Sequence, residues 1–340
     1  MDKLETQGEA GTGGDSGWQF WIDRGGTFTD VVARAPDGRL LVHKLLSEAP
    51  ERYKDASVQG IRDMLGIDKA QPIPAHLVSA VKMGTTVATN ALLERKGERT
   101  VFVTTAGFAD ALRIAYQNRP EIFATRIVLL EMLYEDVIEV DERFSADGQE
   151  LSPVDAQPLR ASLERAYRSG IRSCAIAFMH SYRYPAHERL VAGIAAEVGF
   201  SHISLSHETS PLMKLVSRAD TTVADAYLSP ILGRYVKTVA AELGQTRLMF
   251  MQSSGGLADA QHFHGKDSIL SGPAAGIVGA AKTSSMAGFS KIISFDMGGT
   301  STDVAHFQGE YERSFETEIA GVRLRAPFMS IHTVAAGGGS

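Results

Sequence analysis

Two stretches of the chain share one pattern: an apolar run, a short polar turn with two glycines, and a second apolar run. They cover residues 20–33 and 292–305. Apolar, β-favouring residues on both sides of a Gly-Gly pair predict two strands joined by a tight hairpin whose glycines have positive φ. One such stretch alone would be read as an ordinary glycine hairpin. Because the same residues recur in the same order, we interpret the pair as a duplicated functional element.

The two turns read DRGGTFTD at residues 23–30 and DMGGTSTD at residues 296–303. Consecutive N–H groups in a glycine-rich turn form a concave site for an anion, and neighbouring hydroxyl groups add donors. A carboxylate at a strand end suits Mg²⁺ or a water bound to it. Two such hairpins facing each other are expected to hold the phosphates of a nucleotide. The candidate phosphate-binding residues are Gly25, Gly26, Thr27, Thr29, Gly298, Gly299, Thr300 and Ser301, and the candidate Mg²⁺ ligands are Asp23 and Asp296.

Between and after the two hairpins, the pattern predicts strands and helices in alternation. Apolar runs predict strands at residues 40–45, 77–83, 100–105, 137–144, 171–179, 202–205, 248–252, 311–317 and 329–334. Helical spacing predicts helices at residues 55–65, 84–96, 156–169, 186–198 and 220–243, and a small-residue helix from Ser271. Pro230 interrupts the helix at 220–243, which leaves one helix or two as alternatives. The alternation between residues 137 and 205 favours parallel strands with helical crossovers, which is an α/β fold.

Three further places are candidates for substrate binding. The Gly-Thr-Thr turn at residues 84–86 leads from a strand into a helix, where free amides and the helix dipole favour a negative charge. Simple helix capping accounts for the same residues equally well. A loop arginine before Pro120 suits a substrate carboxylate, and a histidine follows a buried strand, where α/β sheets place ligands. A solvated arginine and a packed histidine are the simpler alternatives. The candidates are Gly84, Thr85, Thr86, Asn90, Arg119 and His180.

The composition is typical of a globular protein that does not bind nucleic acid. The chain has 340 residues, of which 44% are hydrophobic and 22% charged, enough for two domains with cores of their own. We expect a flexible tail at residues 1–17, a first domain at 18–212 and the start of a second at 213–340. A net charge of −6, without a dense run of Lys or Arg, argues against nucleic acid as a partner.

Cysteine content and hydropathy predict a cytoplasmic protein. The single cysteine, Cys174, lies in an apolar run and cannot form a disulfide or a cysteine-ligated metal site within the chain. No apolar stretch approaches the ~18 residues of a membrane span, and the start of the chain lacks the apolar region of a signal peptide. We therefore expect no membrane partner.

The chain stops at a glycine-rich run, residues 335–340, directly after a predicted strand. Such a run normally leads into further structure, so we expect the second domain to be incomplete in these 340 residues. Its strands should then expose apolar faces and open edges, which favours association into a homo-oligomer. Binding of a nucleotide by the isolated chain is therefore expected to be weak or absent.

Two Asp-x-Gly-Gly-Thr hairpins with a small-residue helix before the second resemble the superfamily of actin, hexokinase and heat-shock chaperone ATPases. Its two ribonuclease-H-like domains close on ATP. Finer strings are similar to the hydantoinase A/oxoprolinase family, in the same order from Trp18 to Ser340. They are IDRGGTFTDVVA, MGTTVATNALLERKGER, FMQSSGGL, SGPAAGIVGA, FDMGGTSTDVA and TVAAGGGS. Three others, KLLSE, ALLERKGER and MLYEDVIEVDER, look most like the oxoprolinase members of that family.

The resemblance implies that ATP with Mg²⁺ drives hydrolysis of 5-oxo-L-proline to L-glutamate, with release of ADP and phosphate. Phosphorylation of the carbonyl oxygen would activate the otherwise unreactive lactam for attack by water. Members often carry histidine before Gly-Thr-Thr, whereas Met83 stands here, so no proton relay is expected at that point. A hydantoinase B-like region or subunit is the implied partner. The resemblance implies Asp23, Asp296 and Asp303 as catalytic residues and Thr302, Gly272, Gly337, Gly338 and Gly339 as further nucleotide-binding residues.

Two other functions are alternatives. An ATP-dependent hydantoinase or carboxylase subunit would have the same ATPase core, and a panel of 5-oxoproline, hydantoins and small ketones distinguishes it. A nucleotide-switched binding module would close its domains on ATP without any small substrate. Its ATP turnover would not rise when a lactam is added.

Overall fold

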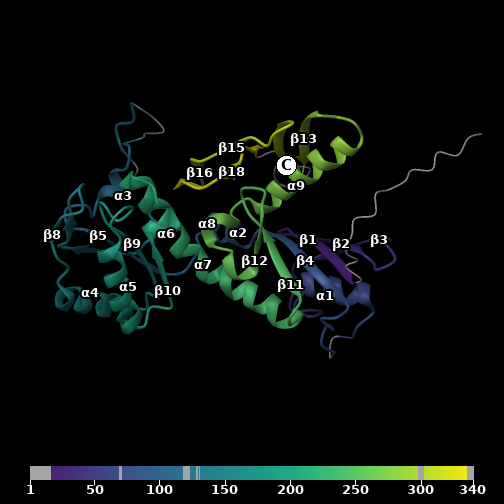
Figure 1. Ribbon diagram of the computed structural model, residues 1–340, viewed down its shortest axis with the longest axis horizontal. Helices are drawn as coiled ribbons and strands as arrows, with labels where there is room; N and C mark the ends of the chain where they lie inside the picture. The colour runs from purple at the N-terminus through teal and green to yellow at the C-terminus, as the bar shows by residue number, and fades with distance from the viewer. Residues whose placement is uncertain are drawn as a thin grey trace, which may run out of the picture. The chain divides into compact units, whose positions relative to one another are not determined.

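A computed structural model describes residues 17–68, 71–117, 123–127, 129, 131–297 and 302–334. The chain divides into two compact units, and each is described by itself. Unit 1 consists of residues Met1–Met83 and Val239–Met249, and unit 2 of Gly84–Thr238 and Phe250–Ser340. The division into domains at residue 212 stays a prediction. Helices and strands are labelled as in Figure 1.

Unit 1 is built on a sheet in which the strands follow the order β11-β4-β1-β2-β3. Their bounds are β1 Trp18–Arg24, β2 Phe28–Arg34, β3 Leu40–Leu46, β4 Val78–Thr85 and β11 Arg247–Met251. β1, β2 and β3 form an antiparallel meander in which Phe20 pairs with Ala33 and Asp23 with Asp30. The first predicted hairpin and the strand that follows it are confirmed.

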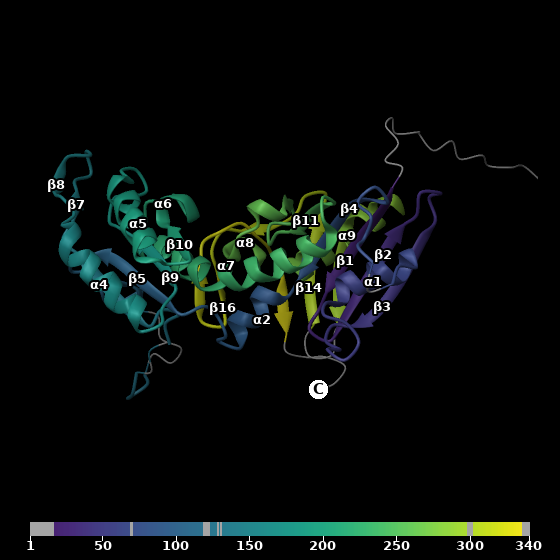
Figure 2. The same ribbon diagram turned by 90° about the horizontal axis from the view of Figure 1, so that it is seen from below.

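Helix α1 (Ala56–Leu65) covers one face of β1, β2 and β3 (Figure 2). Its start is fixed by Asp55, whose Oδ1 accepts a hydrogen bond from Val58 N at 3.1 Å, and its end by Gly66 at φ 66°. Gly60 lets the helix approach the sheet, because a Cβ there would lie 2.7 Å from Val31 Cγ2. The helix predicted at residues 55–65 is therefore confirmed.

The first part of unit 2 is a parallel sheet of four strands in the order β10-β9-β5-β6 (Figure 1). Its elements are α2 Val87–Leu93, β5 Thr100–Thr105, α3 Ala111–Ile114, β6 Asp136–Val140, β7 Arg143–Phe144, β8 Glu150–Ser152, α4 Ala156–Arg168, β9 Ser173–Ala177, α5 Ala186–Val198, β10 His202–Leu205, α6 Ser206–Thr209 and α7 Leu215–Leu243. Successive residues of a strand point to opposite faces. Val101 and Val103 accordingly pack with α4 and α5, whereas Phe102 packs with α7. The predicted parallel arrangement is confirmed.

Helix α7 is continuous through Pro230, so the one-helix alternative is the correct one. Proline removes the N–H that would donate to Ala226 O. That carbonyl instead accepts a hydrogen bond from Ser173 Oγ at 2.6 Å, and Tyr227 O accepts one from Glu98 N at 2.9 Å. The helix keeps its course because neighbouring elements of unit 2 satisfy the carbonyls around the proline.

The rest of unit 2 contains the second hairpin. Its elements are β12 Leu257–Asp259, η1 Ala260–His262, α8 Gly265–Ser268, α9 Ser271–Met286, β13 Lys291–Met297, β14 Thr302–Gln308, β15 Arg313–Ser314, β16 Thr317–Ile319, β17 Val322–Leu324, β18 Phe328–Met329 and β19 His332–Val334. β13, β14 and β19 form an antiparallel sheet, and α9 packs on it through Ile277 against Ala305. The sheets of the protein are thus both parallel and antiparallel.

Three predicted strands are wrong in extent. Residues 137–144 are divided between β6 and β7, because Glu142 leaves the ladder and its Oε1 accepts from Thr105 Oγ1 at 2.5 Å. Residues 311–317 are interrupted where Ser314 Oγ donates to Glu316 O at 2.6 Å. Residues 329–334 are divided where Ser330 N donates to Glu312 O at 2.9 Å. Bonds of these kinds compete with the strand ladder.

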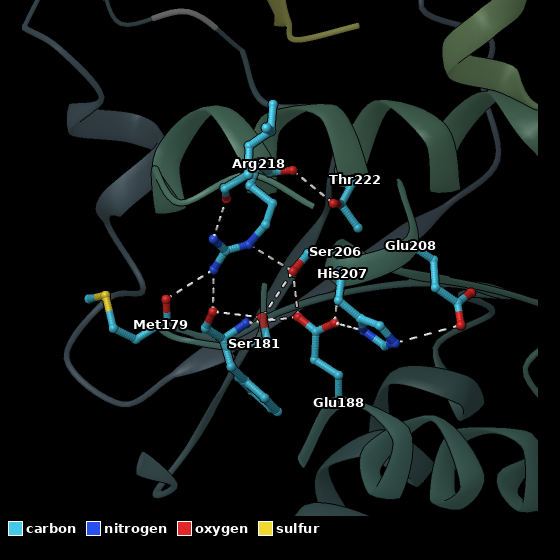
Figure 3. Close-up of polar contacts among 10 residues, drawn as sticks. Met179, Ser181, Glu188, Ser206, His207, Glu208, Arg218 and Thr222 are labelled. Atoms are coloured by element: carbon cyan, nitrogen blue, oxygen red, sulfur yellow. Dashed lines mark hydrogen bonds and ion pairs between the residues drawn. The ribbon is translucent and has the colours of Figure 1, made fainter. Parts of the chain in front are cut away.

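A buried polar cluster ties the ends of the parallel strands to the helices of unit 2 (Figure 3). Arg218 of α7 is fully buried and donates to Ser206 Oγ at 2.9 Å and to Phe178 O. Glu188 of α5 is also fully buried, and its carboxylate accepts from Phe178 N at 3.1 Å and His207 N at 3.2 Å. Burial lowers the pKa of Arg218, and the charge of Glu188 opposes that shift. The cluster fixes the carboxyl ends of β9 and β10.

Candidate functional site

The turn of the first hairpin joins β1 to β2 in unit 1. Gly25 N donates to Phe28 O at 3.1 Å, which closes the turn. Neither Gly25 nor Gly26 is among the glycines with positive φ, so that part of the prediction is wrong. Glycine is required at position 25 for another reason, since a Cβ there would lie 2.9 Å from Phe28 O. Asp23, Gly26 and Thr27 are exposed, so a ligand can reach them.

Ser47, directly after β3, holds this turn from the side. Its Oγ donates to Gly25 O at 2.7 Å and bonds to Thr29 Oγ1 at 3.0 Å, and its N–H donates to Thr27 O at 2.9 Å. Thr29 and Ser47 are both buried. The hydroxyl of Thr29, a candidate phosphate donor, therefore lies inside the hairpin. Ser47 was not among the predicted site residues, although it lies in the KLLSE string.

The second hairpin repeats the first in register. Asp296 pairs with Asp303 across β13 and β14, at the positions that Asp23 and Asp30 hold across β1 and β2. The threonine directly before the second aspartate is buried in both copies, 0% exposed in the first and 3% in the second. Asp296 is exposed like Asp23. The turn itself, with Gly298, Gly299, Thr300 and Ser301, lies outside the described residues.

The second aspartate of each hairpin is held by the next strand of its sheet. Asp30 accepts hydrogen bonds from Lys44 Nζ on β3 at 2.8 and 3.0 Å. Asp303 Oδ1 accepts one from Thr333 Oγ1 on β19 at 2.6 Å. Asp303 is thus anchored within its sheet. That the two turns face each other stays a prediction, because the hairpins belong to different units.

Two motifs that are 186 residues apart meet inside unit 2. Ser271 Oγ donates to Thr85 O at 2.9 Å and accepts from Thr85 N at 3.4 Å, and both residues are fully buried. Thr89 Oγ1 accepts from Leu270 N at 3.1 Å. Helix α9 therefore begins against the Gly-Thr-Thr turn. Gly272, a candidate nucleotide-binding residue, lies in the first turn of α9, where backbone amides have no partner within the helix and favour an anion.

The chain enters α9 under strain. Leu270 has the left-handed conformation φ 60°, ψ 27°, which costs a residue other than glycine about 1–3 kcal/mol. Ser253 of the FMQSSGGL string supports the preceding residues, since its Oγ donates to Ile269 O at 2.6 Å and its N–H to Asp267 O at 2.7 Å. A strained backbone conformation that several neighbouring residues hold in place is typical of binding sites. Ser253, Thr89 and Ser271 were not among the predicted site residues.

The Gly-Thr-Thr turn has a capping role, which does not exclude a binding role. Thr85 Oγ1 accepts a hydrogen bond from Val87 N at 3.2 Å, as the capping alternative requires. Thr86 makes no capping bond through its side chain. Asn90 Nδ2 donates to Thr86 Oγ1 at 3.4 Å, which confirms that these two residues share a face. Both are half-buried, so they are the accessible candidates of this turn, whereas Gly84 is buried.

The other candidate residues do not join this site among the described contacts. His180 Nδ1 bonds to Phe144 O at 2.6 Å beside β7, the kind of contact expected of a packed strand-end histidine. Its substrate role stays a prediction. Arg119, Gly337, Gly338 and Gly339 lie outside the described residues.

The described residues suit Mg²⁺ only as part of a nucleotide complex. No three His, Cys, Asp or Glu side chains in the described ranges lie together as a metal site. Mg²⁺ is usually bound through one or two carboxylates, with phosphate oxygens and water as its other ligands. An exposed aspartate beside a glycine turn, as at Asp23 and Asp296, fits that requirement. As to membranes, no helix in the described part of the chain is long and apolar enough to span one.

The fold and these motifs define an α/β protein with a duplicated pair of antiparallel strands. The chain belongs to the hydantoinase/oxoprolinase family. Residues 19–199 match the model of the hydantoinase/oxoprolinase N-terminal region, and residues 218–340 match the hydantoinase/oxoprolinase model. The family that the six sequence strings predicted is confirmed.

Curated relatives include several proteins named 5-oxoprolinase. The 5-oxoprolinase of Saccharomyces cerevisiae is 44% identical over 94% of this chain and 28% of its own length. The 5-oxoprolinase 1 of Arabidopsis thaliana is 44% identical over 95% of this chain and 28% of its own length. The caprolactamase subunit alpha of Pseudomonas jessenii is 31% identical over 95% of this chain and 48% of its own length. The chain thus spans little more than a quarter of the 5-oxoprolinases it matches.

Two solved structures have the same fold. The ATP-dependent caprolactamase from Pseudomonas jessenii has a TM-score of 0.80 and 30% identity over 95% of this chain and 48% of its own. The nucleotide-free structure of acetone carboxylase has a TM-score of 0.81 and 23% identity over 94% of this chain and 48% of its own. At that identity, acetone carboxylase supports the fold alone. The predicted α/β fold with mixed sheets is confirmed.

Proposed function

We propose that this chain is the nucleotide-binding part of an enzyme that uses ATP to hydrolyse 5-oxo-L-proline to L-glutamate. The observation that carries the proposal is the pair of Asp-x-Gly-Gly-Thr hairpins with matching register, in a chain that is 44% identical to a protein named 5-oxoprolinase. Because the chain spans 28% of that relative, the activity of the whole protein is part of the proposal.

The chemistry requires activation of an unreactive amide. The lactam oxygen takes the γ-phosphoryl group of ATP, and ADP leaves. Water then adds to the activated carbon, the C–N bond breaks, and the nitrogen takes up a proton. A second water releases phosphate, so that one ATP and two waters yield glutamate, ADP and phosphate. Phosphoryl transfer asks the protein mainly to position the groups and to stabilise negative charge.

In this proposal, different residues of the chain position the reacting groups and stabilise the negative charge. Asp23 and Asp296 are the residues that would hold Mg²⁺, which would neutralise charge on the phosphates. Thr27 and the turn amides bind phosphate oxygens, while Ser47 keeps the first turn in shape. The first turn of α9 around Gly272 supplies further amides. Thr86 and Asn90, on one accessible face, contact the substrate or the γ-phosphate.

The direct test measures both products with the native polypeptide that contains this sequence. We expect ADP and glutamate to form in equal amounts from 5-oxo-L-proline and Mg-ATP, and ADP formation to stop when the lactam is left out. ADP formation at the same rate without a lactam would contradict the proposal and favour a nucleotide-switched binding module. Omission of Mg²⁺ is expected to abolish turnover, and restoring it should recover the rate.

A lactam without a carboxylate is the second candidate substrate. The caprolactamase from Pseudomonas jessenii, 30% identical in its solved structure, is an ATP-dependent enzyme. A panel of 5-oxoproline, caprolactam and hydantoin distinguishes these substrates by kcat/KM. The name of that relative as a subunit alpha also supports a hydantoinase B-like partner for this chain. Co-purification of the native protein tests for that partner and for a homo-oligomer.

A further inference from the structure

A pocket of about 1040 Å³ opens within unit 2, apart from the contacts that join the Gly-Thr-Thr turn to α9. The segment after α2, the residues around β6, helix α3 and helix α7 line it. Its apolar wall includes Met132, Leu133 and Tyr227. Pockets that bind small molecules typically combine such a wall with a few polar groups.

Two polar atoms on lining residues are buried without a hydrogen-bond partner. They are Nη1 of Arg95 and the hydroxyl oxygen of Tyr134. A buried polar group left unsatisfied destabilises the protein, and the cost is larger when the group is charged. The ring of Tyr134 is fixed by packing on Phe102, with 5.4 Å between the ring centroids. A ligand that accepts from Arg95 and bonds to Tyr134 would remove both costs.

Arg95 is held in position by a strained contact. Its Nη2 donates to Ala320 O at 3.0 Å, in the turn between β16 and β17. Arg95 has φ 53° and Ala320 has φ 52°, and both values are costly for residues other than glycine. Two strained residues that meet at one contact fix the guanidinium while leaving its other nitrogen unpartnered. Strain of this kind often pre-organises a binding group.

The charged residues around the pocket favour a small ligand that carries both a carboxylate and an N–H group. Arg99 is already paired with Glu135, at 2.7 Å between Nη2 and Oε2, so it adds no free positive charge. Arg113 has no hydrogen bond or ion pair with another described residue. Three acidic residues also line the pocket and would repel a polyphosphate, but they can accept a hydrogen bond from an N–H group. They are Asp110, Glu131 and Asp136.

The lining also brings together two separate segments of the sequence. ALLERKGER contributes Arg95, Gly97 and Arg99, and MLYEDVIEVDER contributes residues 132–137.

We propose that this pocket binds the carboxylate of a small cyclic amide through Arg95 and Tyr134 and so selects substrates that carry a carboxylate. This inference rests on the proposed function for the identity of the ligand, which would be 5-oxo-L-proline. A cyclic amide offers the two features that the pocket requires, a single carboxylate and an N–H donor. The pocket sets the affinity for the lactam and leaves the affinity for ATP unchanged.

The first experiment compares matched variants of the native polypeptide. Arg95→Met is expected to raise KM for 5-oxo-L-proline about tenfold or more, because a charge-assisted hydrogen bond is lost. Tyr134→Phe should raise it severalfold, and Arg95→Lys should recover part of the loss. Arg168→Met and Tyr167→Phe are the controls, since Arg168 is exposed and Tyr167 packs on Phe200 away from the pocket. The Kd for ATP should not change in any of these proteins.

The second experiment separates this inference from the proposed function. Equilibrium dialysis measures binding of radiolabelled 5-oxo-L-proline and of 2-pyrrolidinone, the same ring without the carboxylate, in the absence of ATP. We expect the native protein to prefer 5-oxo-L-proline and Arg95→Met to lose that preference, even if no turnover occurs. Turnover with unchanged KM in both Arg95→Met and Tyr134→Phe would overturn the inference while leaving the proposed function intact. If Arg95→Met fails to fold, unchanged binding in Tyr134→Phe would overturn it alone.

Discussion

The two hairpins have the same strand register, but a helix covers a different face of the strands in each. In unit 1, Phe20 and Ile22 of β1 are 0% and 3% exposed, on the face that α1 covers. In unit 2, Ile293 and Phe295 occupy the equivalent positions of β13 and are 74% and 66% exposed. Helix α9 packs on the opposite face, through Ala305. The same motif is therefore part of a core in one unit and part of a surface in the other.

This difference in burial means that the function of the hairpin and its contribution to stability can be tested separately. The pairing register of the two strands is local, so it is the same in both copies. Burial of the strand face depends on a helix supplied from elsewhere, and among the described residues only the first copy has one on that face. Function should then be shared by the two hairpins, whereas stability should depend mainly on the first. Four predictions test this, in order of decreasing effect.

The largest effect is expected from paired core substitutions. Phe20→Ala should lower the free energy of unfolding by about 3–5 kcal/mol, because it removes a fully buried aromatic ring. Ile293→Ala, at the equivalent exposed position, should change it by less than about 0.5 kcal/mol. Urea unfolding followed by circular dichroism measures both. A loss of similar size in the two variants would mean that the second face is covered in solution.

The next effect is on catalysis and should be equal in the two copies. Asp23→Asn and Asp296→Asn are each expected to lower kcat of the native polypeptide by about 10² or more, because both lose charge at the Mg²⁺-phosphate site. Asp37→Asn, in an exposed turn after β2, is the matched control. A near-normal kcat in one of the two variants would remove that hairpin from the mechanism.

A smaller effect is expected at the residue that holds the first turn. Ser47→Ala should cost about 1–3 kcal/mol, because it leaves the buried hydroxyl of Thr29 and the carbonyl of Gly25 without their partner. The double variant Thr29→Val, Ser47→Ala should be less destabilised than the sum of the single changes. Strict additivity in this double-mutant cycle would show that the two hydroxyls are not coupled.

The smallest effect concerns the exposed face of β13. Phe295→Ser should lower self-association of the 340-residue chain, measured by sedimentation velocity, because it removes part of an exposed apolar strand face. Val42→Ser, at a position of unit 1 that is 74% exposed, is the control for a single exposed apolar residue. If both variants associate like the original chain, this face of β13 has no role in association.

Several features could be predicted from the sequence because they depend on neighbours along the chain. The two hairpins follow from apolar runs on both sides of a glycine pair, and α1 follows from Asp55 at its start and Gly66 at its end. The parallel strands of unit 2 follow from alternating strands and helices. The family followed from six strings in a fixed order.

The remaining features depended on contacts that no local pattern encodes. Pro230 stays within one helix because Ser173, 53 residues away from Ala226, supplies the missing donor. Thr85 meets the start of α9 through the hydroxyl of Ser271, and a lone serine has no periodicity to detect.

The sequence by itself determined the register of both hairpins, the caps of α1 and the family, since backbone geometry and turn chemistry act over a few residues. Only the tertiary structure decided that one hairpin face is buried and the other exposed. It also decided that Arg95 and Tyr134, from separate strings, line one pocket with unsatisfied polar atoms. The physical reason is that burial and hydrogen-bond satisfaction are properties of the whole packing arrangement. Each buried donor must find an acceptor wherever the chain happens to bring one.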